Sequence, residues 1–200
     1  VIRMAVEAGV KKIVALSTDK ASSPVNLYGA TKLTADKLFI SSNNYGKARG
    51  TTFSVVRYGN VMGSRGSVIP FFRSLAEKGE SLPITDLRMT RFWITLPQAV
   101  DFVIQSFTDM TGGELYVPRI PSMKVTDLAE AIAPGAPLVE VGIRPGEKLH
   151  EVMISEDDAR HTIEFPDHYV IQPEFPWWGS SAEQGGDPVD PSFRYSSDQN

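Results

Sequence analysis

The sequence predicts an α/β fold that is built on a parallel sheet. Short apolar runs, which suit strands buried inside a parallel sheet, alternate along the chain with longer segments of helical composition. No internal repeat or coiled-coil heptad run interrupts this alternation. Alternating strands and helices are typical of parallel strands connected by helical crossovers.

The elements follow one another in a regular order. The patterns predict strands over 13–16, 52–58, 90–95, 114–117 and 138–143, and helices over 2–8, 28–42, 70–78, 98–107 and 124–133. In the helix over 98–107 we expect Val100, Val103, Ile104 and Phe107 to face inward. From Trp177 onward Gly, Ser, Pro and Asp dominate without periodicity, which predicts an extended or disordered tail.

The composition excludes several classes of function. The 200 residues are 42% hydrophobic and carry a formal net charge of -4, which gives no electrostatic reason to expect nucleic acid as a partner. No apolar run approaches the length of a membrane span, and no signal peptide is visible. The absence of cysteine fits a cytoplasmic chain and excludes thiol chemistry, and His150, His161 and His168 lack the spacing of metal ligands.

The strand over 13–16 leads directly into a polar run, Ser-Thr-Asp-Lys at 17–20. In open parallel sheets ligands sit at the carboxyl ends of the strands, so this run predicts a reaction centre. The helix that follows carries Tyr28 and Lys32, which are four residues apart and share one face. Because adjacent residues of an extended strand point to opposite sides, we expect the chain to turn at Asp19 and Lys20 so that both side chains reach one site.

Tyr28 and Lys32 have a chemical use together. A lysine cation close to a phenol favours the phenolate, which can take a proton from a substrate alcohol while hydride leaves the same carbon for a nicotinamide. The pair alone is equally well explained as an exposed helix face, because chance yields roughly 0.3 such pairs in a chain of this composition. The neighbouring motifs have to decide between these two explanations.

Five motifs occur along the chain. They are STDKA at 17–21, YGATK at 28–32, RYGNVMGSRGSVIPFF at 57–72, MTRFW at 89–93 and RPGEK at 144–148. With these motifs the chain, up to about Pro173, resembles the extended short-chain dehydrogenase/reductases that act on nucleotide sugars. Among them it most resembles the inverting UDP-N-acetylglucosamine 4,6-dehydratases, because retaining dehydratases usually have Glu where this chain has Lys20.

The resemblance implies how the fold is divided. It implies the C-terminal part of a Rossmann-type doubly wound parallel sheet, at 1–57 and 96–120, with substrate and cofactor loops at 58–95. A smaller α/β substrate-binding lobe would cover 121–176, and a flexible tail 177–200. No Gly-x-Gly-x-x-Gly follows a first strand, and the glycines of 59–66 have the wrong spacing for a dinucleotide-phosphate turn. We therefore expect the cofactor-phosphate motif to lie upstream of this sequence.

The resemblance also implies catalytic roles. Tyr28, helped by Thr18, would act as the base on the sugar 4-hydroxyl, and Lys32 would bind the nicotinamide ribose. After hydride has left C4, Lys20 would remove the C5 proton and Asp19 would protonate the departing 6-hydroxyl. These roles require a neutral Lys20 and a protonated Asp19, which a neighbouring lysine–carboxylate pair opposes unless the two share a proton or separate.

Ligand contacts follow from the same resemblance. The cofactor would be held by Tyr28, Lys32 and the loop residues Val61, Met62, Gly63, Ser64 and Arg65. The substrate would be held by Ser17, Thr18, Asn60, Val68, Phe72, Arg91, Arg144 and Glu147. Of these, the two arginines would clasp the diphosphate, and Glu147 would accept hydrogen bonds from the uridine ribose.

The implied cofactor is NADP, with NAD as the alternative, and the implied partner is a UDP-sugar. The resemblance further implies a cytoplasmic homo-oligomer that supplies sugars for flagellin or surface glycans. Two other functions stay open: another nucleotide-sugar epimerase or retaining dehydratase, and an inactive nucleotide-sugar-binding fragment. We expect the chain alone to be inactive, because no cofactor-phosphate motif is present in it.

Overall fold

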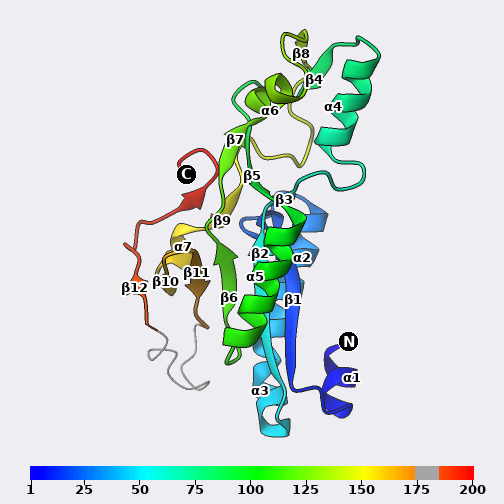
Figure 1. Ribbon diagram of the computed structural model, residues 1–200. Helices are drawn as coiled ribbons and strands as arrows, with labels where there is room; N and C mark the ends of the chain where they lie inside the picture. Colours follow the sequence, from blue (N-terminus) through cyan, green and yellow to red (C-terminus); the bar gives the residue numbers. More distant parts are fainter. Residues whose placement is uncertain (174–184) are drawn as a thin grey trace.

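The computed structural model describes residues 1–173 and 185–200 (Figure 1). Its helices are α1 (Ile2–Glu7), α2 (Leu27–Ser41), α3 (Asn43–Gly46), α4 (Val68–Glu77), α5 (Leu96–Asp109), α6 (Val125–Ile132) and α7 (Glu156–Ala159), with 3-10 turns η1 (Asp19–Ala21) and η2 (Lys47–Arg49). Its strands are β1 (Lys12–Thr18), β2 (Thr52–Tyr58), β3 (Asn60–Val61), β4 (Leu82–Ile84), β5 (Thr90–Ile94), β6 (Leu115–Pro118), β7 (Ser122–Lys124), β8 (Leu138–Glu140), β9 (Val152–Ile154), β10 (Thr162–Glu164), β11 (His168–Ile171), β12 (Asp187–Pro188) and β13 (Tyr195–Ser196). The predicted α/β fold with a parallel sheet is confirmed.

The main sheet has the strand order β1-β2-β6-β11-β10-β12. Strands β1, β2 and β6 run parallel, and β11, β10 and β12 continue the sheet in antiparallel pairing. Thr18 at the end of β1 pairs with Tyr58 at the end of β2, so the two carboxyl ends lie at one edge. The polar run that follows β1 is thereby placed where open parallel sheets bind ligands.

Helices cover both faces of the parallel strands (Figure 1). Val55 belongs to a core cluster against which Phe39 and Ile40 of α2 pack, whereas its neighbour Val56 belongs to a second cluster that contains Phe102 of α5, with Val103 packed against it. Because successive strand residues point to opposite faces, α2 and α5 must lie on opposite sides of β2. This is the doubly wound arrangement that the motifs imply.

The predicted inward face of α5 is wrong for three of its four residues. Val100, Ile104 and Phe107 are 47%, 59% and 45% exposed, and Val103 alone of the four is half-buried. The buried residues of α5 are instead Ala99, Phe102 and Ser106. The helix carries apolar side chains on two faces, and the face that includes Phe102 is the one that packs on β2.

A second, smaller unit holds α4, α6, β4 and β8 and lies at the top of Figure 1. Its core is built from apolar side chains that come from α4, β4, α6 and the segment before β5, namely Phe72, Leu82, Ile84, Met89, Val125 and Ala129. Strand β5 pairs with β3 on one side and with β7 on the other. The lobe is thus joined to the main sheet through β3 and β5, next to the end of β1.

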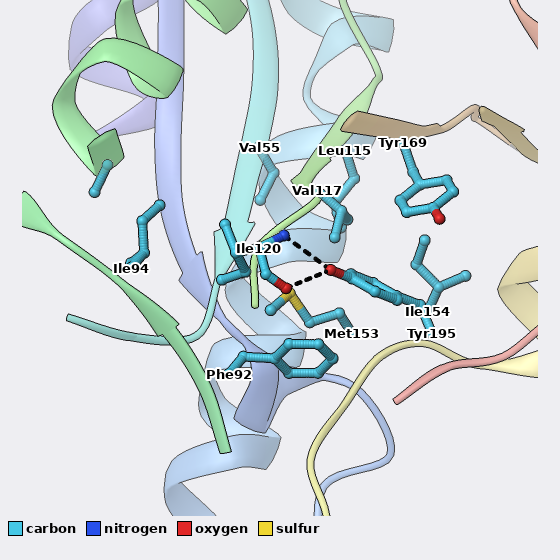
Figure 2. Close-up of a cluster of buried hydrophobic side chains, with 11 residues drawn as sticks. Val55, Phe92, Ile94, Leu115, Val117, Ile120, Met153, Ile154, Tyr169 and Tyr195 are labelled. Atoms are coloured by element: carbon cyan, nitrogen blue, oxygen red, sulfur yellow. Dashed lines mark hydrogen bonds between the residues drawn. The ribbon is translucent and has the colours of Figure 1, made fainter. Parts of the chain in front are cut away.

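Residues 185–200 pack against the body, so the prediction of an extended or disordered tail is wrong for this part of it. Tyr195 of β13 is 4% exposed and lies in the main core against Phe92 and Tyr169, with ring centroids 4.8 and 5.1 Å away (Figure 2). Its hydroxyl accepts from the backbone N–H of Ile120 at 2.9 Å and donates to the Ile120 carbonyl at 3.0 Å. The earlier part of the predicted tail, including Trp177, lies outside the described residues.

Candidate active site

The polar run at the end of β1 forms a tight turn. Thr18 is the last residue of β1 and η1 begins at Asp19, so the chain turns where we expect it to. The turn packs closely on the first turn of α2, since a Cβ added at Gly29 would lie 2.3 Å from the Lys20 carbonyl oxygen. A glycine at this position is what allows the helix to approach the turn.

Asp19 and Lys20 are in direct contact within the turn. One carboxylate oxygen of Asp19 accepts from the Thr18 hydroxyl at 2.8 Å and from the Lys20 ammonium at 3.0 Å. Asp19 has no exposed surface, and its second oxygen has no hydrogen-bond partner among the described residues. The side chain of Lys20 is 37% exposed, and its Nζ also lies 3.5 Å from Asn60 Oδ1. The turn therefore presents Lys20 to a ligand and encloses Asp19.

Tyr28 and Lys32 meet on α2, as their spacing predicts. The Lys32 Nζ lies 5.9 Å from the centroid of the Tyr28 ring, and Tyr28 is 53% exposed. Asn26 caps this helix through its Oδ1, which accepts from the Gly29 amide at 2.8 Å. The cap fixes the start of α2, and with it the position of Tyr28 in the first turn of the helix.

Two cavities that share residues lie beside the turn over Asp19–Ala21. The turn cavity, of about 200 Å³, is lined by Lys20, Val25, Asn26, Asn60, Arg91, Gly146, Glu147, Lys148 and Glu151. The lobe cavity, of about 320 Å³, is lined among others by Ser67, Val68, Phe72, Met89, Trp93 and Arg144. Asn60, Arg91 and Glu147 line both cavities, so the two form one cleft between the turn and the lobe.

Six of the eight predicted substrate residues line this cleft: Asn60, Val68, Phe72, Arg91, Arg144 and Glu147. The start of α4 borders the lobe cavity, and the unpaired amides at the beginning of a helix suit an anion. Basic side chains enter the cleft from the turn, from β5 and from the loop at 144–148. The cleft thus has the charge and the size for a phosphorylated ligand.

Arg91 uses most of its hydrogen-bond donors inside the protein. Its NH1 donates to the carbonyls of Thr90 and Leu149 at 2.7 and 3.1 Å, and its NH2 donates to the carbonyl of Lys148 at 2.9 Å. Its Nε lies 3.8 Å from Glu151 Oε1. One N–H of NH2 is left for a ligand, so Arg91 ties β5 to the segment 148–151 and offers one donor to the cleft.

Ser17 is placed in the core and lines neither cavity. Its hydroxyl donates to Asp36 Oδ2 at 2.8 Å, and the same oxygen lies 3.3 Å from the Arg57 NH2. Burial raises the pKa of Asp36, while Arg57 and the bond from Ser17 lower it. Ser17 therefore binds α2, the helix that carries Tyr28, through its hydrogen bond to the buried carboxylate of Asp36.

The predicted cofactor loop follows β3. Val61 belongs to β3 and pairs with Ile94, while Met62, Gly63, Ser64 and Arg65 are exposed and line neither cavity. Gly63 has a φ of 73° and a Cβ added there would meet no atom within 4 Å. The loop therefore has open space beside Gly63.

Several residues of the cleft were not predicted, among them Asn26, Trp93, Lys148 and Glu151. Asn26 could have been found from its place just before a helix, where Asn is a preferred cap. Lys148 is the last residue of the RPGEK motif and Trp93 is the last residue of the MTRFW motif. Their places in these motifs indicate a ligand site, whereas their residue types alone do not. Glu151 belongs to no motif, and no pattern in the neighbouring sequence indicates that its carboxylate is buried.

Comparison with known proteins agrees with this geometry. The chain is 53% identical over 208 residues to the inverting UDP-N-acetylglucosamine 4,6-dehydratase of Campylobacter jejuni, an alignment that covers 100% of this chain and 62% of that protein. The X-ray structure of Pen from Bacillus thuringiensis superimposes with a TM-score of 0.88 at 35% identity, covering 100% of this chain and 61% of the other. The chain thus spans less than two thirds of the length of these two relatives.

A more distant structure shows the fold alone. It is the dTDP-glucose 4,6-dehydratase of Bacillus anthracis in complex with NAD, with a TM-score of 0.63 and 17% identity over 72% of this chain and 54% of that one. The family model described as polysaccharide biosynthesis protein matches residues 1–173, which include the turn, the YGATK helix and the whole cleft. The chain therefore belongs to the polysaccharide biosynthesis protein family.

Proposed function

We propose that the chain carries the catalytic turn and substrate cleft of an inverting UDP-N-acetylglucosamine 4,6-dehydratase. The observation that carries the proposal is the contact of Lys20 with Asp19 at 3.0 Å, at the carboxyl end of a parallel strand and on the wall of a cleft. Oxidation of an alcohol alone requires neither group, whereas the elimination of water requires a base at C5 and an acid at C6. The 53% identity to the Campylobacter jejuni enzyme supports the same reaction.

Tyr28 begins the reaction by taking the proton of the sugar 4-hydroxyl, assisted by Thr18. Lys20 then removes the C5 proton of the 4-keto sugar, and Asp19 protonates the 6-hydroxyl, which leaves as water. C5 is reprotonated on the opposite face, which gives the inverted 4-keto-6-deoxy sugar. Because Asp19 is fully enclosed, its carboxyl must come into contact with the substrate by a movement of the turn or of its own side chain.

The residues around Tyr28 fit a nicotinamide cofactor, NADP or NAD. A nicotinamide held here would supply the hydride chemistry at C4 and C6. Tyr28 is exposed and the half-buried Lys32 lies beside its ring, and the loop from Val61 through Arg65 leaves open space beside Gly63. Lys32 would hold the ribose, and the loop residues Val61, Met62, Gly63, Ser64 and Arg65 would run along the nicotinamide end.

The cleft would hold the UDP part of the substrate. Arg144 and the free N–H of Arg91 would bind the diphosphate, and Glu147 would accept from the ribose hydroxyls. Val68 and Phe72 would lie beneath the nucleotide. Asn60, Thr18 and Ser17 complete the proposed substrate set, with Ser17 acting through Asp36. We further propose a cytoplasmic homo-oligomer that feeds flagellin or surface-glycan synthesis.

The test is proton NMR of UDP-N-acetylglucosamine in deuterated water. The protein is this chain joined to the part of the Campylobacter jejuni relative that the alignment leaves uncovered, with NADP and, separately, NAD. A C5-inverted 4-keto-6-deoxy product with deuterium at C5 is expected, and Lys20→Ala should slow its formation at least about 100-fold. Lys78→Ala, at an exposed lysine outside the cleft, is the matched control.

Other products would contradict the proposal. A 4-epimer would indicate an epimerase, and a product with retained C5 configuration would indicate a retaining dehydratase. Calorimetry with UDP tests the remaining alternative, an inactive nucleotide-sugar-binding fragment. UDP binding without any turnover in the joined protein would indicate this alternative.

A further inference from the structure

Lys148 is a second lysine beside the catalytic turn, and it is more deeply buried than Lys20. Its side chain is 11% exposed, against 37% for Lys20, and both line the turn cavity. Its Nζ donates to the carbonyl oxygen of Ser22 at 2.6 Å. Ser22 is the residue that ends η1, and its own amide donates to the Asp19 carbonyl at 3.1 Å to close the turn. Lys148 therefore holds the turn from the lobe side.

The charges around Lys148 show how it is kept there. Glu151 Oε2 lies 3.5 Å from its Nζ, and Arg91 lies on the other side of the same carboxylate. Burial lowers the pKa of Lys148, Glu151 and Asp19 raise it, and the cation of Lys20 lowers it further.

We propose that Lys148 is a positioning residue for the C5 proton transfer: its hydrogen bond to the Ser22 carbonyl fixes the turn that carries Asp19 and Lys20. This inference rests on the proposed function. A base at C5 must be aimed at the proton that it removes, and the direction of the Lys20 side chain is set by the turn that Lys148 holds from another wall of the same cavity.

The geometric part of the proposal is tested on the 200-residue chain, without substrate or cofactor. Lys148→Met removes the charge and the hydrogen bond at similar volume, Lys148→Arg keeps the charge, and Lys78→Met is the control at an exposed lysine. Amide hydrogen exchange measured by NMR at Ser22 reports the bond that closes the turn. We expect exchange at least about tenfold faster in Lys148→Met and unchanged in Lys78→Met.

The effect on the reaction is tested on the joined protein by deuterium incorporation at C5. Lys148→Met should lower kcat about tenfold with little change in KM, because a misdirected base slows proton removal and leaves substrate binding intact. Lys148→Arg, which keeps a donor for the Ser22 carbonyl, should restore kcat, whereas a general loss of structure would change kcat and KM together.

The outcomes separate this inference from the proposed function. Unchanged exchange at Ser22 or an unchanged kcat in Lys148→Met overturns the inference. A tenfold lower kcat in Lys148→Arg also overturns it, which decides the matter even if the Met variant does not fold. Absence of any dehydration by the unsubstituted joined protein overturns the proposed function, whereas the exchange at Ser22 still tests the contact of Lys148 with the turn.

Discussion

Replacing Tyr195 by Phe should destabilise the chain by an amount that its contacts with Ile120 define. The Tyr195 hydroxyl satisfies both the N–H and the carbonyl of Ile120. The carbonyl keeps a second donor after the substitution, the Asn200 Nδ2 at 2.9 Å, whereas the N–H loses the partner that the structure gives it. One orphaned buried donor costs about 1–3 kcal/mol, and because the bond from the hydroxyl to the carbonyl is lost as well, we expect a loss in the upper part of this range, about 2–3 kcal/mol.

Thermal unfolding followed by circular dichroism measures this effect. For a chain of this size, a loss of 2–3 kcal/mol corresponds to a Tm lower by about 5–10 °C. Tyr45→Phe, at a tyrosine that is 43% exposed, is the matched control and should change stability by less than about 0.5 kcal/mol. If the Tyr195 and Tyr45 variants have the same Tm, the packed role assigned to residues 185–200 is refuted.

The phenol of Tyr195 also makes the stability of the chain depend on pH in the alkaline range. Burial raises the pKa of Tyr195 to about 12, from an ordinary value near 10. Between these values the unfolded chain has lost the proton and the folded chain keeps it, so stability is full below pH 10 and falls as the pH rises to 12. Tyr195→Phe should therefore show a smaller loss of Tm over this range than the unsubstituted chain.

Three further substitutions test the site. Gly29→Ala should displace the turn, because its Cβ would lie 2.3 Å from the Lys20 carbonyl, and a loss of at least about 1–3 kcal/mol in urea unfolding is expected. Asn26→Ala removes the cap of α2 and should cost about 1 kcal/mol, visible as a lower Tm; an unchanged Tm would contradict the capping role. Asp36→Ala leaves the buried guanidinium of Arg57 without its nearest carboxylate and should cost about 3 kcal/mol, and a urea midpoint equal to that of the unsubstituted chain would refute this pairing.

The main strands and helices could be predicted because their signals are local. The strand over 52–58 is found at those bounds, since Phe53, Val55 and Val56 form an apolar run that needs burial on both faces. The position of the turn over Asp19–Ala21 could likewise be predicted, because a polar run that follows a buried strand has to leave the sheet at its edge. Tyr28 and Lys32 could be paired by spacing alone.

The remaining features depend on neighbours far away in the sequence. Tyr195 lies among polar and turn-forming residues, and its burial comes from Phe92 and Tyr169, which no local pattern connects to it. The α5 helix has apolar side chains on two faces, and composition does not say which face meets the sheet. Glu151 reads as an ordinary surface carboxylate until Arg91 and Lys148 are brought beside it.

Asn26 connects two tasks that the fold otherwise keeps apart. Its Oδ1 caps the helix that carries Tyr28, and its Nδ2 donates to the carbonyl of Gly146 at 2.7 Å, in the loop that carries Arg144 and Glu147. In the proposed function, a change in that loop that suits a different nucleotide would pull on the start of the helix through one side chain. Substrate choice and alcohol oxidation would then be mechanically linked, and a variant selected for a new nucleotide would have to keep this amide in place or replace both of its bonds.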